Sequence, residues 1–216
     1  MAHEEEDSSV TRVLLVRHAQ SQASVRKVIA GSRTCAGLTE LGRTQAALLA
    51  ARLEAEQLPL NSLLTSPVRR ARETADVLAG VLSLGPPTVE PEVRELDFGA
   101  ADGLSIDAYE RAHGAFDMIA HPERPFAPDG ESWSRFRLRA GRVMADLLSR
   151  HRGETVLVVC HAGLIVAVMS ALLDTVPPVL FTDSTPGPTS ISELAHDESG
   201  WTMLRFDDTK HIDEAK

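Results

Sequence analysis

Two stretches of nearly the same sequence decide the fold: VLLVRHA at residues 13–19 and VLVVCHA at residues 156–162, identical at five of seven positions. Each is a run of branched apolar residues that leads to a histidine and an alanine. Such runs are typical of strands buried on both faces of a parallel sheet. Because ligands bind beyond the carboxyl ends of parallel strands, we expect His18 and His161 to lie at one site.

Apolar runs alternate with segments of helical periodicity along the rest of the chain, which predicts an α/β fold with a mostly parallel sheet. Strands are expected at 12–17, 61–65, 156–160, 188–195 and 201–206. Helices are expected at 40–57, 67–83, 105–120, 131–151 and 163–173. The helix from Pro67 has a strong start signal, with Ser66 as its expected N-cap and proline at its first position.

The length of 216 residues is typical of one domain with a substantial core. We expect that domain to span 11–207, with a lid or substrate lobe at about 98–132. Residues 1–10 are interpreted as a disordered acidic tail and residues 208–216 as a solvated tail.

Composition excludes several classes of function. The net charge of −9 provides no basic surface for nucleic acid or for an anionic membrane. The charge-free run from Val156 to Leu173 is explained by a buried strand, turn and helix, so no membrane span is expected. The two cysteines, Cys35 and Cys160, form no CxxC pair, and the acidic start lacks the features of a signal peptide. These features favour a reduced, cytoplasmic protein.

Arginines near the two histidines suggest an anion site. Arg17 ends a buried strand, where a cation is costly without an anionic partner. In the tract TSPVRRARETADVL, Arg69 and Arg72 each have an acidic residue at i+4 and are interpreted as surface residues. Arg70 has no such partner and lies in the first turn of its helix, where an anion is favoured. We therefore expect Arg70 to face a ligand.

The segment VRELDFGAADG carries four carboxylates that could act as a general acid in a closed pocket: Glu92, Glu95, Asp97 and Asp102. Composition alone favours a solvated acidic loop here, so the residues leave the choice open.

Other phosphate chemistries do not fit the sequence. There is no GxxxxGK[ST] motif for a P-loop. Val166 stands where a cysteine-based phosphatase loop starting at Cys160 would need its arginine. Six further histidines form no HExxH or comparable metal-ligand cluster: His3, His113, His121, His151, His196 and His211.

The ordered set LVRHAQS, LTELGRTQA, TSPVRRARETA, RELDFG, DGES and VVCHAG resembles the histidine phosphatase superfamily, in its phosphoglycerate-mutase-like branch. The resemblance covers about residues 12–175. It implies a three-layer α/β/α sandwich with the active site at the carboxyl end of the sheet.

Carried over residue by residue, the resemblance implies that His18 is the phosphorylated nucleophile and that Glu95 is the proton donor. It implies a phosphate pocket made of Arg17, Arg70 and His161, with Ser24 and Ala162 as further substrate-binding residues. It implies no metal and no other cofactor.

Several positions depart from the family pattern. Ala19 replaces the usual glycine after the histidine, and Ser24 replaces an asparagine. Val28 stands where a phosphate-contacting arginine is common, so we consider three nearby cations as substitutes: Arg26, Lys27 and Arg33. These changes fall at the rim that contacts the substrate and leave its identity open.

We therefore predict a metal-independent phosphatase that hydrolyses a small phosphomonoester through a phosphohistidine. The alternative is a phosphoglycerate-type mutase with the same centre, and a third possibility is a catalytically inactive relative that binds or regulates a partner. The expected partner is a small phosphorylated molecule, and a homodimer is left open.

Overall fold

The two histidine-bearing stretches form neighbouring parallel strands at the centre of the sheet. In the computed structural model, which describes residues 10–173 and 185–213, they are β1 (Thr11–Arg17) and β4 (Thr155–Cys160). Their register pairs Arg17 with Cys160, and the backbone N–H of His18 donates to the Cys160 carbonyl over 3.0 Å. His18 and His161 therefore leave the sheet at the same level, as the sequence predicted.

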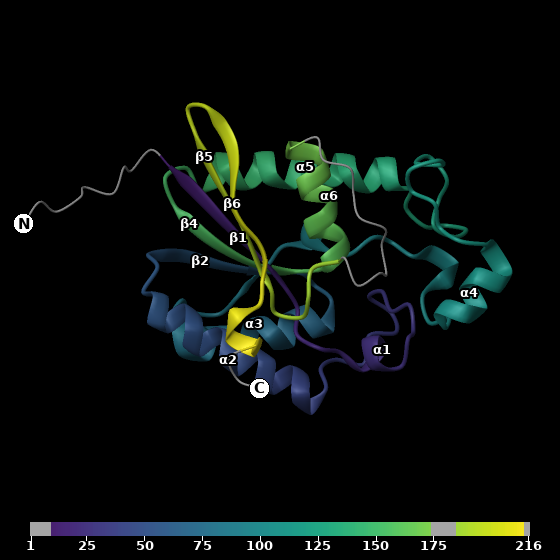
Figure 1. The fold of residues 1–216 in the computed structure, drawn as a ribbon, viewed down its shortest axis with the longest axis horizontal. Helices are drawn as coiled ribbons and strands as arrows, with labels where there is room; N and C mark the ends of the chain where they lie inside the picture. The colour runs from purple at the N-terminus through teal and green to yellow at the C-terminus, as the bar shows by residue number, and fades with distance from the viewer. Residues whose placement is uncertain (1–9, 174–184, 214–216) are drawn as a thin grey trace, which may run out of the picture.

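The described residues form one six-stranded sheet in the order β3-β2-β4-β1-β5-β6 (Figure 1). The remaining strands are β2 (Leu60–Thr65), β3 (Thr88–Val89), β5 (Ile191–Asp197) and β6 (Gly200–Asp208). The first four strands in sequence run parallel, whereas β5 and β6 are added antiparallel at one side. The sheet is thus mostly parallel, as expected.

Helices cover both faces of this sheet, so the fold is the expected three-layer sandwich (Figure 1). One face carries α2 (Glu40–Glu56) and α3 (Arg69–Leu82), and the other carries α5 (Trp133–Arg150) and α6 (Ala162–Leu172). Successive side chains of β1 point to opposite faces of the sheet, so this strand contributes to the hydrophobic cluster on each face. Leu14 and Val16 pack in the cluster with α2 and α3, whereas Val13 and Leu15 pack in the cluster with α5 and α6.

Two predicted helices differ from the observed ones. The helix expected at 105–120 is α4 (Ile106–His113) and ends at Gly114, whose φ of 73° leaves the helical region. The helix expected from Pro67 begins at Arg69, with Val68 as its N-cap. Ser66 does not cap this helix in the predicted way: its hydroxyl accepts from the Val68 N–H, which precedes the helix, and also contacts the ring of His161.

Four short elements were not predicted from the sequence, besides the two-residue strand β3. They are the helices α1 (Gln22–Val25) and α7 (Lys210–Asp213) and the 3-10 turns η1 (Pro91–Val93) and η2 (Gly99–Ala101). Each is too short to show a period in the sequence.

The C-terminal segment corrects the prediction of a solvated tail at 208–216. Asp208 ends β6 and is ion-paired to Arg52 of α2 over 2.5 Å. In α7, His211 is buried and contacts the hydroxyl of Thr189 over 2.9 Å. Asp208 and His211 are therefore packed against the rest of the described residues and not solvated. Residues 1–9 of the predicted N-terminal tail lie outside the described residues.

The predicted lobe at 98–132 contains η2 and α4 and is built around aromatic side chains. Tyr109 stacks on Phe126, with ring centroids 4.3 Å apart, and its hydroxyl donates to the Phe126 carbonyl. Phe98 and Phe116 contact the same ring edge to face. These rings belong to the same hydrophobic cluster as the sheet face under α5 and α6, so this segment packs onto the main core.

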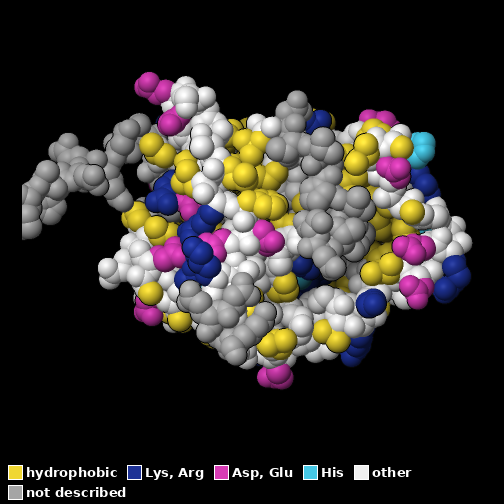
Figure 2. All heavy atoms as spheres, in the orientation of Figure 1, with side chains coloured by type: hydrophobic (Ala, Val, Ile, Leu, Met, Phe, Trp, Pro, Cys, Tyr) yellow, Lys and Arg dark blue, Asp and Glu magenta, His cyan; other side chains and the backbone are white. Residues whose placement is uncertain are grey.

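On the face drawn in Figure 2, lysine and arginine side chains are interspersed with aspartate and glutamate. Within 10–173 and 185–213, no helix is long and apolar enough to cross a membrane.

Candidate active site

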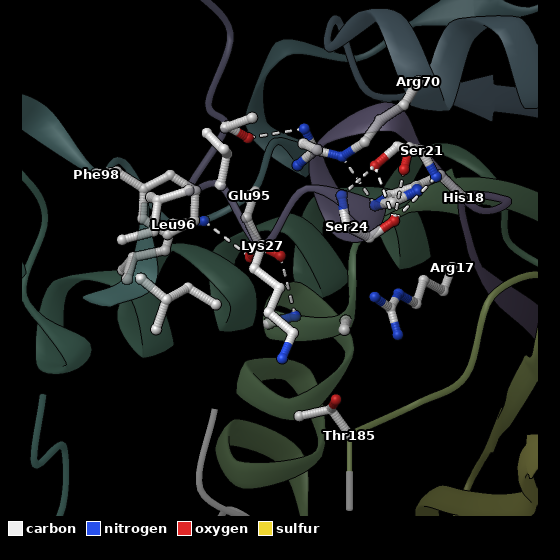
Figure 3. Close-up of a pocket in the computed structure, with 17 residues that line it drawn as sticks. Arg17, His18, Ser21, Ser24, Lys27, Arg70, Glu95, Leu96, Phe98 and Thr185 are labelled. Atoms are coloured by element: carbon white, nitrogen blue, oxygen red, sulfur yellow. Dashed lines mark hydrogen bonds between the residues drawn. The ribbon is translucent and has the colours of Figure 1, made fainter. Parts of the chain in front are cut away.

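A cavity of about 380 Å³ lies where β1, α3 and α6 meet the loop before η2, and the described residues that line it include Arg17, His18, Arg70, Glu95 and Gly163 (Figure 3). This volume is typical of a pocket for a small molecule. Four of the five predicted central residues therefore share one cavity.

His18 is held as a neutral imidazole with a defined tautomer. Its Nε2 accepts a hydrogen bond from Nε of Arg70 over 2.8 Å, and a guanidinium can only donate. Nδ1 therefore carries the proton and donates to the Ala19 carbonyl over 2.8 Å. Burial lowers the pKa of His18 well below its usual value, and the positive charges of Arg70 and Arg17 lower it further. A neutral imidazole with an unprotonated nitrogen is a group that can serve as a nucleophile.

His161 lies behind this group, fully buried and absent from the described cavity wall. Its Nδ1 is 3.2 Å from a guanidinium nitrogen of Arg70, so its Nε2 carries the proton and donates to the Ser66 hydroxyl over 2.7 Å. Burial lowers the pKa of His161 strongly, with the charge of Arg70 as the next cause. The resemblance implied that His161 belongs to the phosphate pocket; in this structure its ring contacts Arg70 and Ser66 and is not part of the described cavity lining.

Arg70 joins the two histidines. It lies in the first turn of α3, is 5% exposed, and also donates to the Ala30 carbonyl over 2.7 Å. Its neighbour Arg69 has the predicted surface role, since it pairs with Glu73 and its side chain is 63% exposed. Arg70 therefore faces the cavity and Arg69 faces solvent, as the sequence predicted.

Arg17 approaches the same end of the cavity from the end of β1 (Figure 3). Its Nη1 donates to the Pro186 carbonyl, and its buried Nε has no hydrogen-bond partner among the described residues. Burial lowers the pKa of Arg17, an effect that the negative charge of Glu95 opposes. An arginine with a free buried donor in a cavity is suited to bind an oxyanion.

Glu95 lies across the cavity from His18 (Figure 3). One carboxylate oxygen accepts from the Gly163 N–H over 3.2 Å at the start of α6, and the other accepts from the Leu96 N–H over 2.9 Å. A Cβ at Gly163 would lie 2.3 Å from Oε1 of Glu95. The glycine in the HAG sequence is therefore needed for the approach of this carboxylate to the helix.

The other acidic residues of the segment lie outside the cavity. Asp102 accepts from the backbone N–H groups of Gly31 and Arg33 and from the hydroxyl of Thr34. Although burial opposes ionisation, these hydrogen bonds lower its pKa, so it is an anionic clamp on the 31–34 loop. Asp97 is exposed and accepts from the Gly99 N–H. Glu92 is also exposed and pairs with Arg94.

Of the three cations considered as substitutes for an arginine at the position of Val28, one lies at the cavity rim. Lys27 lines the cavity, and Figure 3 shows its side chain reaching over it. Arg26 is not part of the described lining, and Arg33 is paired with Asp102. Lys27 has a left-handed backbone conformation, with a φ of 51°.

Two predicted substrate-binding residues, Ser24 and Ala162, also line the cavity. The hydroxyl of Ser24 donates to the Ser21 carbonyl and accepts from the Ser21 N–H, which forms the cap of α1. An apolar wall completes the rim, made of Val28, Leu96, Phe98 and Ile106.

Sequence reasoning missed the residues that orient this site. Ser66 fixes the tautomer of His161, Thr74 accepts from the Ala19 N–H over 3.1 Å, and Gly163 gives Glu95 its place. The described residues contain no group of three or more histidine, cysteine, aspartate or glutamate side chains that could hold a metal ion.

A family model for the histidine phosphatase superfamily (branch 1) matches residues 13–209. This chain belongs to the histidine phosphatase superfamily. The match includes both histidine-bearing strands, the α3 arginines and the Glu95 segment, as the sequence motifs indicated.

Three relatives show what the chain is similar to. A metal-independent phosphoserine phosphatase of Arabidopsis thaliana is 29% identical over 167 residues, which are 75% of this chain and 68% of that protein. A 2,3-bisphosphoglycerate-dependent phosphoglycerate mutase of Brucella anthropi is 30% identical, over 74% of this chain and 80% of that protein. The solved structure of Bacillus stearothermophilus YhfR is 30% identical, with a TM-score of 0.81 over 94% of this chain and 99% of that chain.

Proposed function

We propose that this protein is a metal-independent phosphatase that hydrolyses a small phosphomonoester through a phosphohistidine at His18. The observation that carries the proposal is the neutral His18 ring, whose unprotonated Nε2 is bound by Arg70 at the wall of a cavity that Arg17 also lines and that Glu95 lines on the opposite side. The name of the Arabidopsis relative supports the same activity.

In the first step, the guanidinium of Arg70 gives up its hydrogen bond to Nε2 of His18 and turns to the phosphoryl oxygens. The freed Nε2 attacks phosphorus, and the bond from phosphorus to the leaving oxygen breaks. Arg17 and Arg70 stabilise the charge on the equatorial phosphoryl oxygens, which is the main demand of phosphoryl transfer. Glu95 gives its proton to the leaving alkoxide. His161, which the resemblance assigns to the phosphate pocket, contacts Arg70 through Nδ1 and keeps that arginine at the phosphoryl site.

In the second step, a water molecule attacks the phosphorus of the phosphohistidine. The Glu95 carboxylate accepts the proton of that water, and the bond from phosphorus to Nε2 breaks. Inorganic phosphate leaves, and both His18 and the protonated Glu95 are restored. Over the whole cycle, one phosphomonoester and one water molecule give one alcohol and one inorganic phosphate, and the enzyme is unchanged.

The substrate class follows from the outer cavity. We propose that the organic part of the substrate packs against the apolar wall of Val28, Leu96, Phe98 and Ile106, which the 98–132 lobe helps to form. Lys27 is a cation at the rim that suits a second anionic group, such as a carboxylate. A small phosphorylated acid with an aliphatic or aromatic portion fits both features.

Release of inorganic phosphate from a panel of phosphomonoesters tests the proposal. We expect phosphate release that needs no added bisphosphate and that persists in excess chelator. Activity that returns only on addition of zinc or magnesium after chelation would contradict the metal-independent reaction.

The mutase relative supports one alternative, a phosphoglycerate-type mutase with the same centre. A mutase would interconvert phosphoglycerate isomers faster than it releases phosphate, and 2,3-bisphosphoglycerate would stimulate it. The same assays, run with and without that bisphosphate, separate the two activities.

A further inference from the structure

Arg139 of α5 lies outside the cavity, yet its guanidinium holds the segment that carries Glu95. We call residues 92–97 the acid loop. Arg139 Nη1 donates to the Glu92 carbonyl over 2.6 Å and to the Arg94 carbonyl over 2.9 Å, and Nη2 donates to the Glu95 carbonyl over 3.1 Å. One side chain, 44 positions away in sequence, thus binds three carbonyls of the acid loop.

The charge of Arg139 is balanced by Glu131, which lies just before the N-cap Ser132 of the same helix. The two side chains form a bidentate pair, with Nε to Oε1 at 3.1 Å and Nη2 to Oε2 at 2.7 Å. They are only 7% and 11% exposed. With these two bonds the arginine makes five hydrogen bonds, one for each of its N–H donors.

Glu131 holds the other end of the acid loop. Its backbone N–H donates to the Asp97 carbonyl over 2.8 Å, and its carboxylate is 3.3 Å from the Asp97 N–H. Arg139 and Glu131 therefore form hydrogen bonds to the acid loop on both sides of Glu95. Burying two charges destabilises a protein unless every polar atom finds a partner. A fully partnered buried ion pair that binds both ends of the acid loop therefore indicates that the position of this loop matters.

We propose that Arg139, with Glu131, is a positioning residue that places the carboxyl of Glu95 at the leaving oxygen. This inference rests on the proposed function, in which Glu95 is the general acid. Arg139 is not part of the described cavity lining. It acts through the backbone of the acid loop, and a displacement of about 1 Å at a catalytic group can cost about 10²-fold in rate.

The first test is Arg139→Lys, which keeps the charge but lacks the planar fork of five donors. Phosphoenzyme formation is measured in a single turnover with an alkyl phosphate and with p-nitrophenyl phosphate. Nitrophenolate leaves almost without a proton, so it reports on the site without the acid. We expect a loss of about 10- to 100-fold on the alkyl phosphate and about 2-fold or less on the nitrophenyl ester.

Arg135→Lys is the matched control, because Arg135 lies on the same helix but is exposed; it should leave both rates unchanged. Glu131→Gln removes the partner from the other side and provides a second variant should Arg139→Lys fail to fold. It should show the same dependence on leaving group. Equal losses on both substrates in Arg139→Lys and Glu131→Gln would overturn the proposal in favour of general structural damage.

A double-mutant cycle with Glu95→Gln separates this inference from the proposed function. If Arg139 acts through Glu95, then Arg139→Lys causes little further loss on the alkyl phosphate in the Glu95→Gln background. Additive losses would refute the positioning role while leaving Glu95 as the acid. If Glu95→Gln alone loses equally on both substrates, the acid assignment fails, and this proposal fails with it.

Discussion

Nε of Arg70 donates to Nε2 of His18 over 2.8 Å, and a second nitrogen of the same guanidinium lies 3.2 Å from Nδ1 of His161. One buried cation thus binds the histidines at the ends of β1 and β4. Because the guanidinium can only donate, both rings are neutral acceptors toward it. Arg70 of α3 therefore connects the histidines that follow the two strands of similar sequence.

The three arginines of the RRARE tract should differ sharply in their effect on activity. Arg70→Ala removes a cation from the phosphoryl site and should cost about 3–4 kcal/mol of transition-state stabilisation, measured as kcat/KM. Arg69→Ala breaks only an exposed pair with Glu73 and should cost about 0.3–0.5 kcal/mol of stability, with near-normal turnover. Arg72 is exposed, and Arg72→Ala should be equally mild. An inactive Arg69→Ala would show that Arg69 serves the phosphoryl site and would contradict the assignment of Arg70.

A methyl group at residue 163 should damage the acid without damaging the helix. In Gly163→Ala the new Cβ would lie 2.3 Å from Oε1 of Glu95, so the carboxylate must move. We expect hydrolysis of alkyl phosphates to fall by about 10²-fold, within the usual range for a lost general acid. In the control Gly80→Ala, on α3, the new Cβ has open space and should stabilise the protein by about 0.5–1 kcal/mol with unchanged activity. Wild-type turnover in Gly163→Ala would argue against the observed place of Glu95.

Acid should destabilise the protein through the two buried histidines. Their folded-state pKa values are well below the ordinary value near 6.5, so below about pH 6.5 the unfolded chain binds more protons than the folded one. The free energy of unfolding should therefore fall as pH is lowered from 7 to 5, by up to about 1.4 kcal/mol per pH unit for each histidine. Denaturant titrations should show a shallower pH dependence in His161→Gln. The same slope in both proteins would mean that His161 is not held neutral.

Lys27 should affect the choice of substrate but not the chemistry. Its side chain reaches over the cavity, so Lys27→Gln should raise KM by about 1.5- to 5-fold for phosphomonoesters that carry a carboxylate, the range of an exposed ion pair. KM for uncharged alkyl phosphates and kcat should stay the same. Arg26→Gln is the control, since Arg26 is not part of the described lining. Equal effects in the two variants would point to general surface charge and not to a substrate contact.

The strands and the ends of β1 and β4 were predictable because their apolar runs are local patterns. Arg70 was also predictable, because a helix places residues at fixed angles and left it without an acidic neighbour. The motif resemblance added the role of Glu95, which composition alone did not separate from Asp97 and Asp102. The structure separates them, because only Glu95 reaches the cavity.

The residues that orient the site could not be predicted, since their partners are distant in sequence and follow no period. Ser66 meets His161 across 95 positions, and Arg139 meets the Glu95 carbonyl across 44. Ser66 resembled an ordinary helix cap, and Arg139 resembled one more charged residue on an amphipathic helix. The predicted helix at 105–120 was too long, because a helical pattern continued past the point where Gly114 turns the chain.

Trapping the phosphoenzyme tests the assignment of His18 as the nucleophile most directly. Brief reaction with a ³²P-labelled phosphomonoester, followed by quenching, should give protein-bound label that is lost in acid and stable in alkali, as expected for a phosphohistidine. The label should be absent in His18→Ala and present in His113→Ala, where the histidine replaced lies on α4, outside the described cavity lining. Label of the same chemistry in His18→Ala would contradict the assignment of His18 as the nucleophile.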